Sequence, residues 1–277
     1  ILRAGMKKTP RSIRVIATKI TGGLHLAKKK PCQDFYQYAC SGNKLVAVVS
    51  DGAGSAKYGK IGAKVVCETL VNVLINTPLK DAEEAVKKAI DIARRRLVIH
   101  RLNKSKSESE ILNFSATLVG AVYHKNRGLF FHIGDGAGIA VYGETTVGTG
   151  LRYTLSRPAN GNFSCETYFY TMSNWRDCLR FTEISKAEAL FLMTDGVTNF
   201  ALSDDACRLK NGFIEPINRY LKSEQNKMQA LRALNNTLDT KQARRLNSDE
   251  KTFLGAGLSR VTGKVTVMLL AGLLYTS

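Results

Sequence analysis

Apolar runs of strand length occur in blocks along this chain, and pairs of longer amphipathic segments separate the blocks. Runs of strand length and alternating runs predict strands, and apolar residues at helical spacing predict helices. We expect strands over residues 12–22, 34–40, 44–50, 114–124, 128–135, 138–144 and 189–195, and helices over 59–76, 81–102, 204–221 and 223–238. Strand blocks separated by paired helices favour an α+β fold with antiparallel sheets over a βαβ series. Because no repeat or Pro/Gly linker divides the chain, we expect residues 1–277 to form a single domain.

The chain is strongly basic, with 41 Lys and Arg against 23 Asp and Glu and a net charge of +18. No acid precedes Asp34, so the start of the chain is basic throughout, including an N-terminal extension over residues 1–11. Such a field attracts phosphate-bearing partners, whether nucleic acid, phosphoprotein or nucleotide, although a merely solvated surface accounts for it equally well. Because aromatic residues do not interleave with the basic ones, nucleic acid is not the favoured partner.

The longest uncharged apolar stretch covers residues 265–275, whereas a helix that crosses a membrane needs about 20 residues. The apolar run over residues 15–18 is too short for the core of a signal peptide. The six cysteines form no CxxC pair and have no His partner at zinc spacing, which indicates reduced thiols. We therefore expect a cytoplasmic monomer with no membrane partner.

Acidic residues stand at the ends of the predicted strands. Three apolar runs end in Asp-Gly, at Asp51, Asp135 and Asp195; Asp34 directly precedes a strand, and Asp249 stands at the mouth of another apolar run. Taken singly, each Asp-Gly is best interpreted as a turn. Taken together, carboxylates without His or Cys partners describe an all-oxygen site of the kind that Mg²⁺ or Mn²⁺ prefers, and a cation removes their mutual repulsion. Two such ions about 3.5–4 Å apart can ionise a bridging water and stabilise in-line attack at phosphorus.

Five motifs in this chain resemble, in their order, those of the type 2C metal-dependent protein phosphatase family (PPM). They are DGAGSAKYGKIGA (51–63), FSATL (114–118), IGDGAG (133–138), LFLMTDG (190–196) and SDEKTFL (248–254). The segments KKPCQDFY (29–36) and NGNFSCETYFYTMSNW (160–175) resemble bacterial members in particular. The matches span roughly residues 20–258. The resemblance implies two stacked antiparallel β-sheets flanked by helix pairs, an αββα sandwich, with a two-metal centre at one end.

The resemblance also implies a metal-binding role for the acidic positions. It makes Asp51 the bridge between two Mg²⁺ or Mn²⁺ ions, with the carbonyl of Gly52 on one of them. It places Asp195 and Asp249 on the other ion. Asp135 corresponds to an acid that can help to hold a third metal.

The implied reaction is hydrolysis of phosphoserine and phosphothreonine by a hydroxide that bridges the two ions, without a phosphoenzyme. Besides Asp51, the implied catalytic residues are Asp34, which would hold metal-bound water, and Lys29, which stands where many members place a phosphate-binding Arg. Residues 158–175 correspond to the variable flap beside the active site. The implied partners are a phosphorylated protein substrate and a cognate Ser/Thr kinase in a signalling pathway.

The sequence departs from the family pattern in ways that affect the chemistry. Ala53 stands where the family has a histidine proposed as general acid, so the acid is unassigned and His25 and metal-bound water are its candidates. Asn199 replaces an acid that follows the Asp195 motif, which weakens a third metal site. Two apolar runs, residues 252–258 and 265–274, compete for the last core strand. We favour the first, preceded by Asp249, because DEKT (249–252) keeps both acids and the Thr of the family motif.

Two other functions fit parts of the sequence. Residues 54–61 nearly match a nucleotide-binding P-loop, but Ile61 replaces the hydroxyl that would hold Mg²⁺, so an NTPase is less favoured. In the other alternative the protein keeps the fold, has weak or no activity, and binds phosphorylated or nucleic-acid partners through its basic face. Retention of the strand-end aspartates argues against that alternative.

Overall fold

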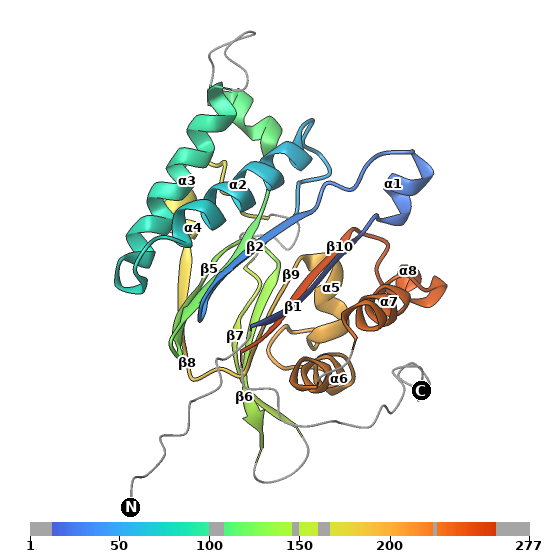
Figure 1. Cartoon of the computed structure of the whole chain (residues 1–277). Helices are drawn as coiled ribbons and strands as arrows, with labels where there is room; N and C mark the ends of the chain where they lie inside the picture. Colours follow the sequence, from blue (N-terminus) through green and yellow to red (C-terminus); the bar gives the residue numbers. More distant parts are fainter. Residues whose placement is uncertain (1–12, 100–107, 146–149, 160–166, 224–225, 259–277) are drawn as a thin grey trace, which may run out of the picture.

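Two five-stranded sheets stack face to face in the computed structural model, which describes residues 13–99, 108–145, 150–159, 167–223 and 226–258 (Figure 1). One sheet joins, in spatial order, β1 (Arg14–Ile20), β10 (Lys251–Gly257), β9 (Ala189–Met193), β6 (Ala137–Glu144) and β7 (Leu151–Ser156). The other joins β2 (Phe35–Ser41), β3 (Lys44–Ser50), β4 (Leu118–His124), β5 (Arg127–Ile133) and β8 (Arg180–Ser185). Every pairing between these strands is antiparallel, which confirms the predicted α+β class.

Helices cover the outer face of each sheet, as the sandwich requires (Figure 1). On the sheet that contains β3 lie α2 (Gly59–Leu74) and α3 (Ala82–Ile99), and on the other sheet lie α5 (Asp195–Ala201), α6 (Asn211–Lys222) and α7 (Lys227–Leu238). Shorter helices are α1 (Gly23–Ala27), α4 (Trp175–Cys178) and α8 (Lys241–Leu246), with 3₁₀ turns at Leu79–Asp81 and Glu108–Phe114. The predicted helix pairs are therefore present, one on each side.

Strand β3 shows how the sequence builds these layers. Every residue of β3 is buried, and its side chains alternate between two apolar clusters because successive residues of a strand point to opposite faces. Val46 and Val48 pack in the cluster under α2 and α3, whereas Leu45, Ala47 and Val49 pack in the cluster between the sheets. This continuous apolar run is the signature of a strand covered on both faces.

Several segments differ from the sequence prediction. Strands β7 and β8 are not among the strands that the sequence predicted. Residues 204–210 are not helical, so the helix expected from residue 204 begins as α6 only at Asn211. The first apolar run at the end of the chain forms β10, which pairs with both β1 and β9. The competing run, 265–274, and the basic extension, 1–11, lie outside the described residues.

The described part of the predicted flap packs into the body of the protein. Tyr170 and Trp175 are buried at 0% and 1% exposure in the cluster beneath α2 and α3. The Tyr170 hydroxyl donates to the carbonyl of Gly62 at 2.9 Å, and Arg94 donates to the carbonyls of Tyr170 and Met172, both at 2.9 Å. Trp175 is therefore a packing anchor rather than a substrate contact. Residues 160–166 lie outside the described part of the chain.

Among the described residues, no helix combines the length and the apolar character that a membrane span requires.

Candidate metal centre

The five predicted aspartates meet at one end of the sandwich, because the strands that carry them end or begin there. Asp51 follows β3, Asp135 follows β5, and Asp195 follows β9 as the first residue of α5. Asp34 immediately precedes β2, and Asp249 lies just before β10. Antiparallel neighbours alternate in direction, so ends of some strands and starts of others share one edge. Both sheets therefore contribute carboxylates to a single cluster.

The pKa values of these carboxyl groups show how close the charges lie. Burial raises the pKa of Asp34 to about 7, with a further rise from the negative charge of Glu250. Burial and then the charge of Asp34 raise the pKa of Asp51 well above its usual range. Burial and then the charge of Asp51 do the same for Asp195, with Asp135 and Asp249 adding to the effect. Carboxylates that disfavour one another's charge in this way are a configuration that a divalent cation stabilises.

Threonine side chains fix this cluster. The hydroxyl of Thr194 donates to Asp34 Oδ2 at 2.8 Å, and the hydroxyl of Thr167 donates to Asp135 Oδ2 at 2.7 Å. The main-chain N–H of Asp51 donates to Thr117 Oγ1 at 3.0 Å. The other carboxylate oxygen of Asp34 and of Asp135, Oδ1 in each case, is buried without a hydrogen-bond partner. Because buried polar atoms are nearly always satisfied, two orphaned carboxylate oxygens in an all-oxygen cluster fit a hard cation.

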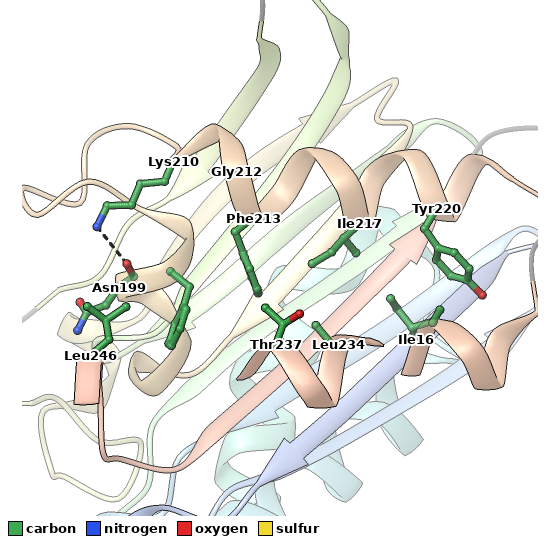
Figure 2. Close-up of a pocket in the computed structure, with 12 residues that line it drawn as sticks. Ile16, Asn199, Lys210, Gly212, Phe213, Ile217, Tyr220, Leu234, Thr237 and Leu246 are labelled. Carbon is green, nitrogen blue, oxygen red and sulfur yellow. Dashed lines mark hydrogen bonds between the residues drawn. The ribbon is translucent and has the colours of Figure 1, made fainter. Parts of the chain in front are cut away.

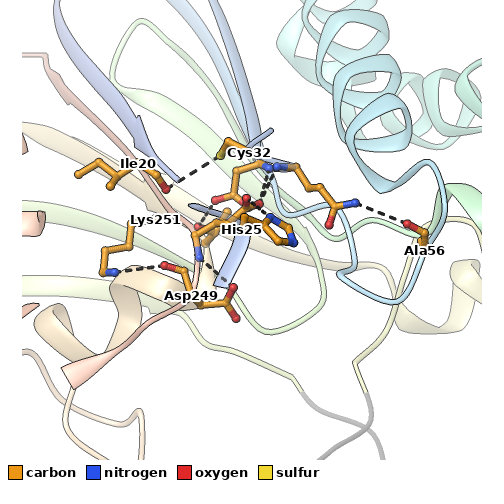
Figure 3. A network of polar contacts seen from close by, with 10 residues as sticks. Ile20, His25, Cys32, Ala56, Asp249 and Lys251 are labelled. Carbon is orange, nitrogen blue, oxygen red and sulfur yellow. Dashed lines mark hydrogen bonds and ion pairs between the residues drawn. The ribbon is translucent and has the colours of Figure 1, made fainter. Parts of the chain in front are cut away.

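Glu250 is the residue that the sequence analysis missed. Its carboxylate shares a group with Asp34 and Asp51 in which one oxygen of each lies within 4.8 Å of the others. Glu250 Oε2 accepts the main-chain N–H groups of Gln33 at 2.6 Å and Asp34 at 3.1 Å, and Oε1 lies 2.5 Å from His25 Nδ1. Glu250 therefore holds the segment that carries Asp34 against the start of β10. Figure 3 shows the surrounding network of polar contacts, with His25 and Asp249 labelled. Glu250 could have been identified in the sequence as the second acid of the SDEKTFL motif, directly after Asp249.

The glycines of the three Asp-Gly pairs serve close packing rather than turns. Gly52, Gly136 and Gly196 are absent from the glycines with positive φ, so the turn interpretation of these pairs is wrong in this respect. A Cβ on Gly52 would stand 2.4 Å from the carbonyl carbon of Gly59, and one on Gly196 would stand 1.7 Å from the carbonyl oxygen of Glu250. Each glycine therefore lets a second backbone segment approach the aspartate that precedes it.

A cavity of about 340 Å³ opens beside the cluster. Its lining consists of Gly22, His25, Lys28, Lys30, Gln33, Asp51, Gly52, Gly54, Ser248, Asp249 and Glu250. Positive side chains thus share the wall with the carboxylates, as an anionic ligand requires. Lys28 and Lys30 belong to this lining, whereas the predicted Lys29 does not, and Lys29 takes a positive φ of 51°.

The two departures from the family pattern take ordinary structural places. Ala53 is 7% exposed, and its N–H donates to the carbonyl of Ser115 at 2.9 Å. Asn199 lies along α5 in the lining of a second, apolar cavity rather than in the lining of the acidic one. Neither residue replaces the chemistry of the side chain that the family places there.

The comparisons with known proteins agree with this geometry. A family model described as Protein phosphatase 2C matches residues 21–239. The solved structure of the serine/threonine phosphatase Stp1 from Staphylococcus aureus has a TM-score of 0.57 at 16% identity, covering 92% of this chain and 99% of its own. The Mycobacterium tuberculosis serine/threonine phosphatase PstP/Ppp has a TM-score of 0.58 at 14% identity, covering 90% of this chain and 99% of its own. RsbX, solved in complex with magnesium, has a TM-score of 0.55 at 14% identity, covering 89% of this chain and 96% of its own.

At these identities the solved structures support the fold, and the family model supports the family. A search of the curated proteins finds no match to this sequence.

Proposed function

We propose that this chain, which belongs to the protein phosphatase 2C family, is a protein serine/threonine phosphatase, and that two Mg²⁺ or Mn²⁺ ions in the carboxylate cluster support hydrolysis of phosphoserine and phosphothreonine. The observation that carries the proposal is the pair of buried, unpartnered oxygens, Asp34 Oδ1 and Asp135 Oδ1, within the cluster. Asp51, the Gly52 carbonyl, Asp195 and Asp249 would hold the two ions, and Asp135 would help with a third. When bound, such ions lower the pKa of water and neutralise charge on the phosphoryl group.

The protein's own side chains would bring the phosphate to this centre. Lys28 and Lys30 line the cavity and provide the positive charge that a phosphoryl group requires. As single ammonium groups they attract the phosphate without the two-pronged hydrogen bonding of Arg. Lys29 remains a predicted phosphate contact. A variant series at these positions can separate the three lysines.

Asp34 would position and polarise water through its carboxylate. Its Oδ2 is fixed by Thr194 and its main chain by Glu250, so the carboxylate has a single defined orientation. In the metal-free protein, burial raises the pKa of Asp34 to about 7, and bound cations would favour its charged, hydrogen-bond-accepting form.

His25 is our candidate for the group that protonates the leaving alcohol, in place of the histidine that Ala53 lacks. It lines the cavity, and its Nδ1 is held by Glu250 at 2.5 Å. A carboxylate hydrogen-bonded to one ring nitrogen fixes the orientation of an imidazole. The other nitrogen, Nε2, is then available to donate a proton.

The leaving group provides a direct test of His25. p-Nitrophenolate, with a conjugate-acid pKa of about 7, needs little protonation, whereas phenolate, with a pKa of about 10, needs much more. His25→Ala should therefore slow phenyl phosphate hydrolysis about tenfold more than p-nitrophenyl phosphate hydrolysis. Equal losses for the two substrates would remove His25 from this role and leave water as the acid.

Metal-dependent hydrolysis tests the proposed function as a whole. The wild-type protein should hydrolyse p-nitrophenyl phosphate and a phosphothreonine peptide only with Mg²⁺ or Mn²⁺ present. Asp195→Asn should reduce the rate at least about 100-fold. The control is Asp204→Asn, whose side chain is fully exposed and pairs with Lys210. Equal rates for the wild type and Asp195→Asn would overturn the proposal.

The expected substrate is a phosphorylated protein, with a serine/threonine kinase as the opposing enzyme and the cytoplasm as the place of action. The family supports the substrate class, and the kinase and compartment follow as part of the same proposal. The acidic cluster argues against the P-loop alternative. In that alternative the carboxylates that line the cavity would face the negatively charged phosphates of a nucleoside triphosphate. The inactive-binding alternative predicts no metal-dependent turnover in the assay above.

A further inference from the structure

A second cavity, of about 260 Å³, lies between α6 and α7 on the outer face of the sheet that contains β10. Figure 2 shows it as an elongated groove, with Ile16 and Tyr220 at one end and Asn199, Lys210 and Leu246 at the other. We call this cavity the α6–α7 groove. Its lining is Ile16, Asn199, Phe200, Lys210, Gly212, Phe213, Ile217, Tyr220, Ala230, Leu234, Thr237 and Leu246. It plays no part in the proposed chemistry.

The α6–α7 groove is mostly apolar and reaches the surface. Phe213 and Ile217 of α6 face Leu234 of α7 across it, and Leu246 at its edge is 55% exposed. Apolar surface that gathers in one open groove generally marks a place where another apolar segment packs.

The chain itself supplies a segment that fits this groove. Beyond β10 the sequence continues with VTVMLLAGLLY over residues 265–275, which contain no charged side chain. This is the apolar run that competed for the last core strand. Because β10 occupies the place between β1 and β9, the run does not form the core strand for which it competed.

The chain leaves β10 beside one end of the groove. A Cβ on Gly257, the last residue of β10, would stand 2.9 Å from the carbonyl oxygen of Leu221, the neighbour of the groove residue Tyr220. Residues 259–264 can span up to about 20 Å when extended, and the stretch of α6 from Gly212 to Tyr220 is about 12 Å long. Residues 265–275 can therefore reach every part of the groove within the same molecule.

We propose that residues 265–275 of this chain dock in the α6–α7 groove. Docking removes the apolar side chains of the segment and of the groove from water together, which favours the docked state. It also braces α5, because Asn199 and Phe200 lie in the groove wall and Asp195 is the first residue of the same helix. The proposal concerns packing and does not depend on the metal centre.

Amide hydrogen exchange on the full chain tests the proposal from both sides of the contact. Leu270→Asp with Leu273→Asp places two charges in the segment, and Thr276→Asp with Ser277→Asp adds the same charges beyond it. Leu246→Asp places a charge at the groove edge, and Met228→Asp, 58% exposed on α7 and outside the groove lining, is its control. The Leu270→Asp/Leu273→Asp variant and the Leu246→Asp variant should each speed amide exchange in α6 and α7 about tenfold. The two control variants should exchange like the wild type.

Three results would overturn the proposal. Exchange that is unchanged by both charged variants would show that the segment does not cover the groove. Protection that grows with protein concentration would assign the groove to the segment of a second copy. An increase in the protection of α6 and α7 when an apolar small molecule is added to the wild type, with no effect of the Leu270 and Leu273 substitutions, would assign the groove to a small ligand.

Discussion

The first turn of α5 lies directly against the start of β10: a Cβ on Gly196 would stand 1.7 Å from the carbonyl oxygen of Glu250. This close approach brings Asp195, which precedes Gly196, near Asp249, which precedes Glu250. Asp195 and Asp249 are far apart in the sequence. They share a site because Gly196, which has no Cβ, lets the two backbone segments approach each other closely.

Gly196→Ala should therefore separate α5 from β10 and damage the metal centre. The expected result is a loss of stability of about 2 kcal/mol, typical of overpacking against a backbone, with weaker binding of Mn²⁺. Gly54→Ala is the matched control, because Gly54 also lines the acidic cavity but has nothing within 4 Å of an added Cβ. Calorimetric titration with Mn²⁺ and thermal unfolding measure both effects. Identical behaviour of the two variants would contradict the proposed packing role of Gly196.

Glu250 should act as a positioning residue through the two N–H groups it accepts. Glu250→Ala leaves the N–H of buried Asp34 without its acceptor, at about 1–3 kcal/mol, and the N–H of half-buried Gln33 loses its acceptor at a smaller cost. Glu250→Gln keeps an acceptor oxygen and should lose less stability. Urea unfolding should rank the wild type above Glu250→Gln and Glu250→Ala last. If both variants unfold like the wild type, Glu250 does not hold this segment.

Lys28 and Lys30 should control the binding of anionic substrates. Replacing both by Ala should raise the KM for a phosphopeptide about tenfold with a smaller change in kcat, and should weaken the salt dependence of kcat/KM. The control replaces Lys80 and Lys88, two exposed lysines outside the cavity lining. Lys29→Ala, measured alongside, tests the residue that the family resemblance favoured. An unchanged KM in the Lys28 and Lys30 double variant would rule out their role.

The raised pKa of Asp34 predicts a specific pH dependence of stability in the metal-free protein. Because burial raises this pKa from 3.8 to about 7 in the folded state, folding is favoured when the group is protonated. The stabilising contribution is complete below pH of about 4 and is lost as the pH rises through about 7. In EDTA, wild-type Tm should fall relative to Asp34→Asn across this range, and the gap should level off above it.

Divalent cations should reverse that difference. Cations bind the charged form of the cluster, so excess Mg²⁺ should raise the Tm of the wild type more than that of Asp34→Asn at pH 8. Asp204→Asn, at a fully exposed position, provides the reference for the substitution itself. A gap between the wild type and Asp34→Asn that is constant with pH would contradict the burial argument.

The sequence was a good guide wherever the decisive contacts are local. The apolar run of β3 and the amphipathic spacing of α2 and α3 are read directly from neighbouring residues, and the structure confirms them. The strand-end aspartates were identified because three apolar runs end in the same dipeptide, Asp-Gly, and such a repetition indicates a shared role. Their convergence follows from the antiparallel fold, which the resemblance implied and the strand pairing confirms.

The misses depend on contacts between distant parts of the chain. Glu250 meets the N–H of Asp34 across a sequence separation of 216 residues, and no local pattern reports such a contact. The glycines after Asp51 and Asp195 have the same signature in the sequence whether they serve a turn or a close approach. Strand β8 is half-exposed along most of its length, so it lacks the continuous apolar run that identified β3.

The central claim is that the carboxylates around Asp51 hold two divalent cations, and anomalous diffraction from crystals grown with Mn²⁺ tests it most directly. The account predicts two anomalous peaks about 3.5–4 Å apart, both within coordination distance of Asp51, with Asp195 and Asp249 on one of them. Crystals of a folded protein with saturating Mn²⁺ and no anomalous peak beside Asp51 would contradict it.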